Sequence, residues 1–431
     1  GGVTDVVRVG LLGCGNVGAA LVRLLDSNAD LITQRSGVKL DVTRVAVHNV
    51  AKERDVVLAP GVLTNDADAI VSDPAVDVVV EVIGGIEPAR SLILAALQQG
   101  KPVVTANKEL LANVGAELFE AAERAGVDLL FEASVAGGIP LIRPLRESLA
   151  GEKIRRVTGI VNGTTNFILT RMSEEGSSFS DALAEAQSLG YAERDPTADV
   201  EGFDAAAKAA ILASIAFGAK IVAGDVYREG IAQITPSDIT AARDLGYVVK
   251  LLAVAEELDG SIAVRVHPAM IPSEHPLASV RGSFNAVFIE GAAVGELMLY
   301  GRGAGGGPTA VAVLGDLVDA AKNLRSGAKG AAFGTLTRVP IHPIDEVESQ
   351  FYVTVDVADR PGVLSAIAGV FGKHDVSIQS MQQAGRGAEA HLIFVTHLAR
   401  EADLRATMHE VGELDAVERV GSVLRVVGGA G

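Results

Sequence analysis

The chain has 431 residues, a net charge of −17 and a hydrophobic content of 48%, but only 4% of its residues are aromatic. This length predicts two or three domains with aliphatic cores, and the negative charge argues against a nucleic-acid partner. No apolar run approaches the ~20 residues that span a bilayer, and the first run leads into glycines rather than a signal-peptide pattern. For this reason we expect no membrane partner. The single cysteine, Cys14, cannot form an internal disulfide, which fits a reducing compartment, so we expect a cytoplasmic location.

A dinucleotide-binding fingerprint stands near the start of the chain. An apolar strand is predicted over Val6–Leu12, followed by the motif GCGNVG and an amphipathic helix that runs to about Leu25. In this motif the first glycine permits a tight turn, the second lets the backbone reach a pyrophosphate, and the third lets the helix pack on the strand. The helix N-terminus then offers free N–H groups to the phosphates. We therefore predict cofactor contacts at Gly13, Gly15, Asn16, Val17 and Gly18.

Strands and helices alternate through the next hundred residues. Apolar runs predict strands over residues 40–47, 76–83, 103–106 and 127–131, with helices such as 90–98 and 115–125 between them. The alternation predicts a doubly wound parallel sheet, in which ligands bind beyond the carboxyl ends of the strands. The segments expected at those ends are residues 84–85, 105–108 and 132–140.

The end of the second predicted strand bears on the choice of cofactor. An acidic residue at this place would bind the ribose 2′-hydroxyl of NAD. The sequence instead has His48 and Asn49, with Lys52 and Arg54 close behind. These cations can meet a 2′-phosphate, so we favour NADP over NAD, although such residues are also common on solvated loops.

From about residue 139 the strict alternation ends, which predicts an α+β substrate domain with an oligomer face. A strand is expected over 155–161, followed by the polar turn NGTTNF, which can cap the next helix. Further on we expect a helix start at TPSD (235–238) and strands over 263–266 and 286–291. The glycine-dense segment GRGAGGGPTA is either a flexible linker or a loop that returns to the nucleotide domain, before a helix that Pro308 opens.

The segment YAERDPTADVEGFDAAAKAAI, residues 191–211, gathers acids ahead of an alanine-rich, apolar helix. Asp204 and Lys208 stand four residues apart on that helix and therefore point the same way. A lysine within a packed helix needs a partner or a polar ligand. One interpretation is a surface pair that stabilises the helix by about 0.2–0.5 kcal/mol. The acids just upstream favour the other, a site for hydride transfer.

The sequence of the last part of the chain predicts a separate small module. The segment VPIHPID after Arg338 is typical of a linker. Strands are predicted over 351–357, 376–381 and 390–396, and the turn DRPGVL leads into a helix after the first of them. This β-α-β-β order over about 80 residues predicts a ferredoxin-like fold.

Several long segments resemble one family, and they follow in that family's order. They are GCGNVG, VVEVIGGIEPA, VVTANKELLA, FEASVAGGIPLIRPL, VNGTTNFIL, LGYAERDPTADVEGFDAAAKAAIL and YGRGAGGGPTA. Together they resemble the homoserine dehydrogenases that carry a C-terminal ACT domain, and DRPGVL resembles the ligand-binding turn of ACT domains. The resemblance implies four parts: a Rossmann domain over 1–138, completed by a helix at about 308–325; a catalytic and dimerisation domain over 139–307; a linker over 326–348; and an ACT domain over 349–431.

The resemblance also implies a reaction and the residues that carry it. The reaction is NAD(P)H-dependent reduction of L-aspartate 4-semialdehyde to L-homoserine, in threonine, methionine and isoleucine biosynthesis. Lys208 matches the family's catalytic lysine and Asp204 the acid one turn before it. Lys108 matches the lysine near the nicotinamide and the reacting oxygen. Glu193 and Asp199 match residues that hold the substrate's amino group or order its water.

Other ligands are implied in the same way. Gly303 falls on a glycine loop that closes over the cofactor, and His48 stands where many relatives carry arginine. The ACT domain implies threonine as an effector, and we expect a homodimer or homotetramer. A sodium ion is implied at backbone carbonyls, those of Glu132, Val135, Gly137 and Ile139.

Two other classes of protein stay open. Another dehydrogenase with an ACT tail, such as a prephenate or phosphoglycerate dehydrogenase, would share the fingerprint and the terminal module. Those enzymes rely on a histidine in the site, and residues 193–208 contain none. A non-catalytic amino-acid sensor that binds a nucleotide is the second alternative, and the intact acid–lysine segment counts against it. The ACT module itself could be a dimerisation module with a vacant site.

Overall fold

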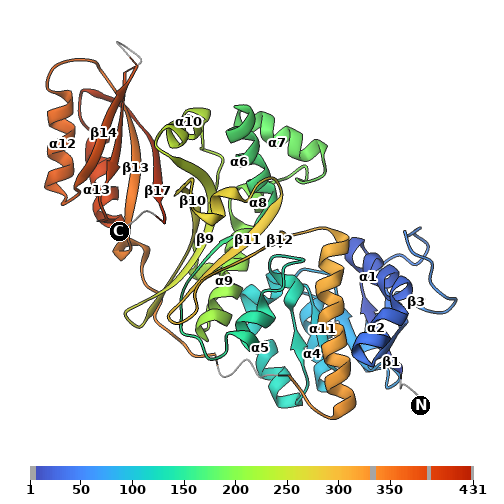
Figure 1. The fold of residues 1–431 in the computed structure, drawn as a ribbon. Coiled ribbons are helices and arrows are strands. Elements are labelled where there is room, and N and C mark those ends of the chain that lie inside the picture. Colours follow the sequence, from blue (N-terminus) through green and yellow to red (C-terminus); the bar gives the residue numbers. More distant parts are fainter. Residues whose placement is uncertain (1–5, 331–335, 386–389, 429–431) are drawn as a thin grey trace. The chain divides into compact units, whose positions relative to one another are not determined.

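A computed structural model describes residues 6–330, 336–385 and 390–428 of the chain. The chain divides into two compact units, each built from three separate stretches (Figure 1). The first unit comprises residues 1–157, 207–226 and 284–339, and the second comprises 158–206, 227–283 and 340–431. Two elements, the strand β7 (Ile154–Ile160) and the helix α9 (Phe203–Phe217), run from one unit into the other.

The first unit contains a six-stranded parallel sheet with the order β3-β2-β1-β4-β5-β6. This order, with the first strand in the middle, belongs to doubly wound dinucleotide-binding domains and confirms the predicted fold class. Its strands are β1 (Val6–Leu12), β2 (Lys39–Ala46), β3 (Leu63–Thr64), β4 (Val78–Glu81), β5 (Val103–Thr105) and β6 (Leu129–Leu130).

Helices cover this sheet, and one of them comes from much later in the chain. The late helix, α11, lies beside α1 (Figure 1). Its apolar residues, such as Val313 and Leu317, belong to the same core as Val9 of β1 and Leu21 of α1. The glycine-dense segment therefore leads directly into this nucleotide-binding core. The helices are α1 (Asn16–Ser27), α2 (Ala29–Ser36), α3 (Ala67–Ser72), α4 (Ala89–Gln98), α5 (Lys108–Ala125) and α11 (Gly306–Ser326).

Two of these helices begin earlier than the sequence predicts. Helix α5 starts at Lys108 rather than near Gly115, because Asn107 caps it and only a local irregularity at Val114 interrupts it. Helix α11 starts at Gly306, two residues before Pro308, so the proline lies in its first turn, where it needs no N–H partner.

In the second unit the strands β9 (Tyr247–Leu258) and β10 (Ser261–Pro272) form a long antiparallel pair. The sequence predicted only residues 263–266 of this pair. Both strands are buried over most of their length, so they lack the alternation of polar and apolar residues that reveals a half-buried strand. Smaller elements stand with them: α6 (Gly163–Glu175), α7 (Phe179–Ser188), α8 (Thr197–Val200), β8 (Tyr227–Arg228) and α10 (Pro236–Asp244).

The C-terminal module has a β-α-β-β-α-β order and its own apolar core. Its antiparallel strands lie in the order β17-β13-β15-β14, as in a ferredoxin-like fold, which confirms the predicted class. A second helix and a last strand complete the pattern predicted from the sequence. The elements are β13 (Glu348–Val357), α12 (Val363–Lys373), β14 (Ile378–Ala384), β15 (His391–Thr396), β16 (Ala399–Arg400), α13 (Glu401–Gly412) and β17 (Val417–Val426).

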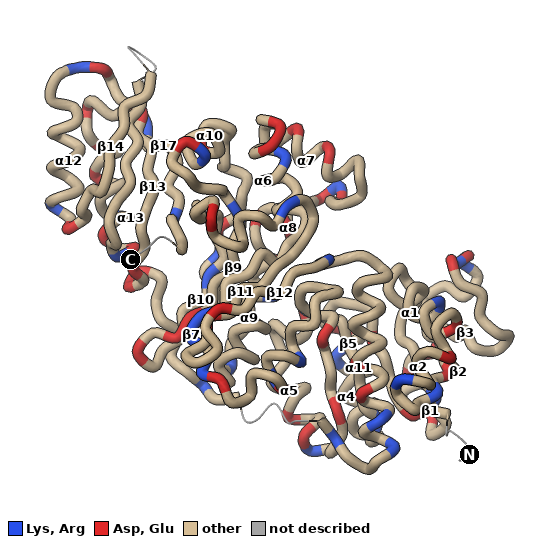
Figure 2. Tube along the Cα trace, in the orientation of Figure 1, with Lys and Arg blue, Asp and Glu red and all other residues tan. Residues whose placement is uncertain are grey.

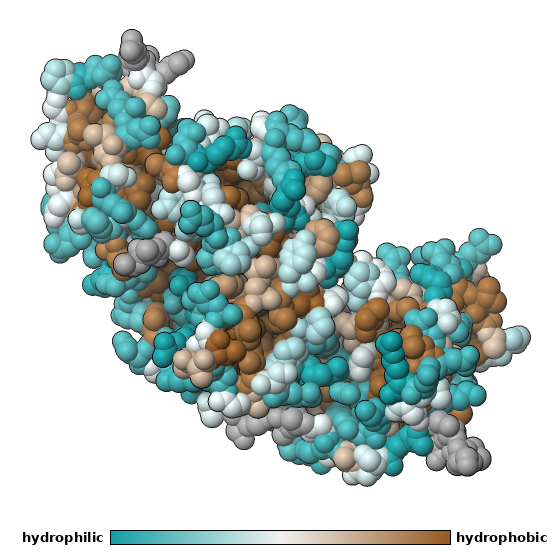
Figure 3. All heavy atoms as spheres, in the orientation of Figure 1, coloured by the Kyte–Doolittle hydropathy of each residue, from teal (hydrophilic) through white to brown (hydrophobic). Residues whose placement is uncertain are grey.

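Charged residues of both signs are distributed along both units (Figure 2), and apolar atoms also reach the surface (Figure 3). In the first unit the hairpin of β11 (Phe284–Gly291) and β12 (Gly295–Arg302) exposes Met298 by 37% and Tyr300 by 52%. An exposed strand with apolar side chains is a surface suited to protein association. Among the described residues, no helix combines the length and apolarity needed to cross a membrane.

A buried lysine joins β9 to the helix α6 in the second unit. The side chain of Lys250 is 2% exposed, and its ammonium donates to Asn166 Oδ1 at 3.0 Å and to the carbonyl of Val280 at 2.6 Å. Burial lowers the pKa of Lys250 to about 8, although the nearby carboxylate of Glu174 opposes this shift. The folded protein therefore releases this proton at a lower pH than the unfolded chain does.

We predict that the stability of the protein depends on pH through Lys250. Between pH 7 and 9.5 the unfolded chain keeps the proton that the folded protein has released, so raising the pH favours the folded state. Relative to a Lys250→Met variant, the wild-type free energy of unfolding should rise by about 2 kcal/mol over this window. Urea unfolding at both pH values measures it. The exposed Lys373→Met variant is the control, and parallel pH profiles of wild type and Lys250→Met would contradict the prediction.

Candidate active site

The glycine loop after β1 has the backbone geometry that its motif predicts. Gly13 has a φ of +98°, a conformation that side chains disfavour. A Cβ at Gly18 would lie 2.7 Å from the carbonyl oxygen of Gly13, so only glycine allows α1 to pack this closely. A Cβ at Gly15 would meet nothing within 4 Å. The loop is therefore tight at Gly13 and Gly18 and open at Gly15, where α1 presents its free N–H groups.

A cavity of about 930 Å³ lies at the carboxyl ends of β1, β2 and β4, in front of this loop. Its volume is within the range of pockets that hold cofactors. Helix α11 also contributes its first residues, Gly306 and Gly307. The predicted cofactor residues that line the cavity are Gly13, Gly15, Asn16 and His48.

The end of β2 brings charges of both signs to this cavity. Lys52 and Arg54 line it, and so do Glu53 and Asp55. The guanidinium of Arg54 donates to the carbonyls of Asn49 at 2.6 Å and Lys52 at 2.7 Å, which folds this loop upon itself. The cations predicted to meet a 2′-phosphate therefore face the cavity together with two acids.

A second cavity of about 290 Å³ in the first unit contains both predicted lysines. Lys108 comes from the start of α5 and Lys208 from α9, although they are a hundred residues apart in the sequence. Val17, Gly137 and Gly303 line the same cavity. The structure thus brings together two cationic side chains, the cofactor loop and the late glycine loop.

Two further polar residues line this cavity: Glu81, which the sequence analysis did not single out, and Asn107, which lies in the predicted segment 105–108. Glu81 is fully buried at the end of β4, and its carboxylate accepts from the N–H groups of Ile83 at 2.8 Å and Gly84 at 3.0 Å and from the Thr105 hydroxyl at 2.7 Å. Asn107 caps α5 and donates to the carbonyl of Gly85 at 2.7 Å. An acid at the end of an apolar strand was the available signal for Glu81.

In the second unit one asparagine holds two of the predicted acids. The amide nitrogen of Asn162 donates to Asp199 Oδ1 at 2.7 Å and to Asp204 Oδ2 at 2.8 Å. Its amide oxygen accepts from the backbone N–H of Thr165 at 2.8 Å and so caps α6. The sequence predicted the cap at NGTTNF but not the second function of this side chain.

The remaining acid of the predicted set, Glu193, lies on the loop between α7 and α8. Its side chain is exposed, and its backbone carbonyl accepts from the Gln187 amide at 3.0 Å. Asp204 is 8% exposed and lies in the first turn of α9, one turn before Lys208. Asp199 and Asp204 thus form one cluster through Asn162, with Glu193 on the loop before it.

The segment predicted to bind sodium makes a sharp turn in the first unit. The carboxylate of Glu132 accepts from the N–H groups of Leu141 at 3.0 Å and Ile142 at 2.6 Å, so its side chain is engaged by the backbone of the following segment. Gly137 has a φ of +47°, and a Cβ there would lie 2.3 Å from the carbonyl oxygen of Gly303. Val135 and Ile139 are buried. These features fit a site built from backbone carbonyls, and among the described residues no cluster of His, Cys, Asp and Glu could hold a metal ion.

Comparison with known proteins identifies related sequences along almost the whole chain. Residues 13–132 match the family "Homoserine dehydrogenase, NAD binding domain", residues 140–318 match "Homoserine dehydrogenase", and residues 351–416 match "ACT domain". The homoserine dehydrogenase of Mycobacterium tuberculosis is 50% identical over 433 residues and 98% of each chain. That of Corynebacterium glutamicum is 50% identical over 430 residues, which are 99% of this chain and 96% of the relative.

Solved structures agree with these sequences. A homoserine dehydrogenase from Thiobacillus denitrificans has a TM-score of 0.93 at 43% identity, covering 98% of both chains. A hyperthermophilic archaeal homoserine dehydrogenase in complex with NADPH has a TM-score of 0.62 at 31% identity, covering 73% of this chain and 98% of that one. The resemblance found in the sequence is thereby confirmed. The chain belongs to the homoserine dehydrogenase family of NAD(P)-dependent oxidoreductases and carries an ACT domain near its C-terminus.

Proposed function

We propose that this protein interconverts L-aspartate 4-semialdehyde and L-homoserine with a nicotinamide cofactor. The observation that carries the proposal is the cavity shared by Lys108 and Lys208, which also contains Val17 of the cofactor loop. The cofactor supplies the hydride. When a hydride reaches an aldehyde carbon, negative charge develops on the oxygen, and two lysines beside that oxygen can stabilise the charge and supply a proton.

The residues of α9 and the acid cluster divide the remaining tasks. We assign proton transfer to and from the substrate oxygen to Lys208, and stabilisation of that oxygen to Lys108. Asp204 lies one helical turn before Lys208, where its carboxylate can orient the ammonium group. Glu193 and Asp199 offer counter-charges to the substrate's amino group. A sodium ion at the carbonyls of residues 132–139 would stiffen the turn that meets the loop at Gly303.

NADP is the cofactor that we favour for the larger cavity. Its support is the absence of an acid directly at the end of β2, where His48 stands, and the presence of Lys52 and Arg54 in the cavity lining. A 2′-phosphate gives these cations a charged partner, whereas a 2′-hydroxyl does not. Arg54 already bonds to backbone carbonyls, so Lys52 is the more available of the two.

Threonine is the effector that we propose for the ACT domain. The turn between β13 and α12 ends at Gly362, which has a φ of +86° and precedes the free N–H groups of the helix. A free amino acid can place its carboxylate there. We also propose that the exposed strand β12 contributes to a homodimer.

We predict that Lys208→Ala abolishes most turnover but leaves cofactor binding nearly intact, because this lysine acts on the substrate oxygen and not on the phosphates. Loss of a general acid costs roughly 10²–10⁴-fold in rate. Steady-state kinetics with homoserine and fluorescence titration with NADPH measure the two quantities. Lys220→Ala, which removes a partly exposed lysine paired with Glu120, is the matched control. Ordinary turnover by Lys208→Ala would refute the assignment.

We predict that Lys52→Ala weakens NADPH binding about tenfold and leaves NADH binding unchanged, because only NADPH carries the 2′-phosphate. Titrations with both cofactors measure the ratio. Lys39→Ala removes an exposed lysine at the start of β2, outside the cavity lining, and serves as the control. An equal loss for both cofactors would show that Lys52 does not read the 2′-phosphate.

We predict that threonine inhibits the full chain and that Gly362→Ala weakens this inhibition several-fold, because a side chain strains the left-handed turn. Gly369→Ala, in the middle of α12 with open space around the added Cβ, should keep full sensitivity. Homoserine oxidation at increasing threonine concentration measures both. A wild-type enzyme that ignores threonine would favour a vacant module, and equal sensitivity of Gly362→Ala would place the effector site elsewhere.

A further inference from the structure

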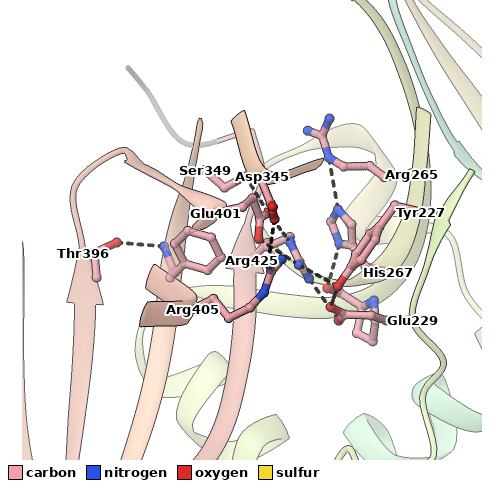
Figure 4. Close-up of polar contacts among 12 residues, drawn as sticks. Tyr227, Glu229, Arg265, His267, Asp345, Ser349, Thr396, Glu401, Arg405 and Arg425 are labelled. Carbon is pink, nitrogen blue, oxygen red and sulfur yellow. Dashed lines mark hydrogen bonds and ion pairs between the residues drawn. The ribbon is translucent and has the colours of Figure 1, made fainter. Parts of the chain in front are cut away.

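A buried arginine on the last strand of the ACT domain connects it to the loop after β8 (Figure 4). Arg425 is 5% exposed. Its guanidinium makes a two-pronged contact with the Glu401 carboxylate, at 2.6 Å and 3.0 Å. It also donates to Glu229 Oε2 at 3.0 Å and to the Tyr227 hydroxyl at 3.3 Å. The guanidinium thus joins α13 of the ACT domain to residues 227–229.

The charges in this cluster hold it in one arrangement. Burial alone lowers the pKa of Arg425, but the hydrogen bonds and charge of Glu401, together with those of Glu229, outweigh burial and raise that pKa. The Tyr227 hydroxyl donates in turn to Glu229. A buried, charge-assisted network of this kind loses much of its stabilisation when a partner moves, because an unpaired charge would remain. The network therefore constrains the position of Tyr227 and Glu229 relative to β17.

Residues 228–231, next to this cluster, contact residues 200–203 at the start of α9. The Arg228 guanidinium donates to the Glu201 carbonyl at 2.5 Å and lies 3.7 Å from the centre of the Phe203 ring. The backbone N–H of Ile231 donates to the Val200 carbonyl at 2.8 Å. A Cβ at position 230 would lie 2.3 Å from that same carbonyl oxygen, so glycine is required there.

Residues 200–203 lie between the two acids of the cluster, Asp199 and Asp204. Residues 200–203 are followed by Asp204 in the first turn of α9, and Asp199 precedes them. Asn162 bonds to both carboxylates, at 2.7 Å and 2.8 Å. A shift of residues 228–231 therefore displaces the chain on which both acids stand.

We propose that Arg425 is a positioning residue for substrate binding: through Glu229 and Tyr227 it holds residues 227–231, and through them the acids Asp199 and Asp204. The ACT domain thereby sets the affinity for the amino-acid substrate without touching it. An effector that moves β17 would change that affinity by the same route. The inference rests on the proposed function, which assigns Asp199 to the substrate's amino group and Asp204 to the orientation of Lys208.

The test uses the full chain with Arg425→Lys and Glu229→Gln. Both keep size and polarity but weaken the contact between β17 and the loop after β8. We expect each to raise the KM for homoserine about tenfold, since small displacements of positioning groups have large effects, with the KM for the cofactor within twofold of wild type. Arg405→Lys is the matched control, because that arginine pairs with Asp345 on the surface of the same unit.

The double variant distinguishes positioning from general destabilisation. If both residues act through one contact, Arg425→Lys combined with Glu229→Gln raises the KM for homoserine no more than the stronger single change. Single variants with a lowered Tm but wild-type KM values would overturn the inference, and so would multiplicative effects. If Arg425→Lys does not fold, the KM of the Glu229→Gln variant tests the inference alone, because Arg425 keeps its contact with Glu401 in that variant. A wild-type chain that does not oxidise homoserine would refute the proposed function instead.

Discussion

The second unit depends on one neutral side chain that satisfies two charged ones. Two carboxylates that lie close together repel each other, and burial adds the free energy of removing them from water. The Asn162 amide has two N–H donors, so it can bond to Asp199 and Asp204 at once while its oxygen caps α6. A lysine or arginine in this place would offset part of the negative charge of the pair, so the pair would attract an ammonium group less strongly. A neutral donor bonds to both carboxylates and adds no positive charge to the pair.

The first unit depends instead on two places where backbone segments approach each other closely. Gly18 lies against Gly13, and Gly137 lies against Gly303, at distances that no side chain would permit. The first approach fixes the start of α1, and the second brings the late glycine loop to the cavity of the two lysines. The ammonium group of Lys108 and the N–H dipoles of α1 thus lie at the first residues of helices, which are more rigid than long loops. Such rigidity favours a fixed geometry around a reacting oxygen.

Local patterns predicted those parts of the molecule whose structure is decided locally. The strand, glycine motif and helix at the N-terminus follow from spacing alone, as does the cap at Asn162. The strands β9 and β10 were largely missed because burial on both faces removes the period of two. The second function of Asn162 was missed because its partner Asp204 is 42 residues away. The local pattern of residues 191–211 singled out Lys208, whereas Lys108 was identified only through its family motif. No local pattern shows that two helices a hundred residues apart contribute lysines to one cavity.

The last strand of the chain takes part in two pairings. β17 pairs antiparallel with β13 inside the ACT domain and parallel with β10 at Ala269 and Met270. Without the ACT domain, the N–H and C=O groups along this part of β10 would be exposed to water and to other chains. Unprotected edges of this kind invite intermolecular strand addition and aggregation. The ACT domain therefore also acts as an edge cover, and a shortened enzyme would need a substitute for it to stay monodisperse.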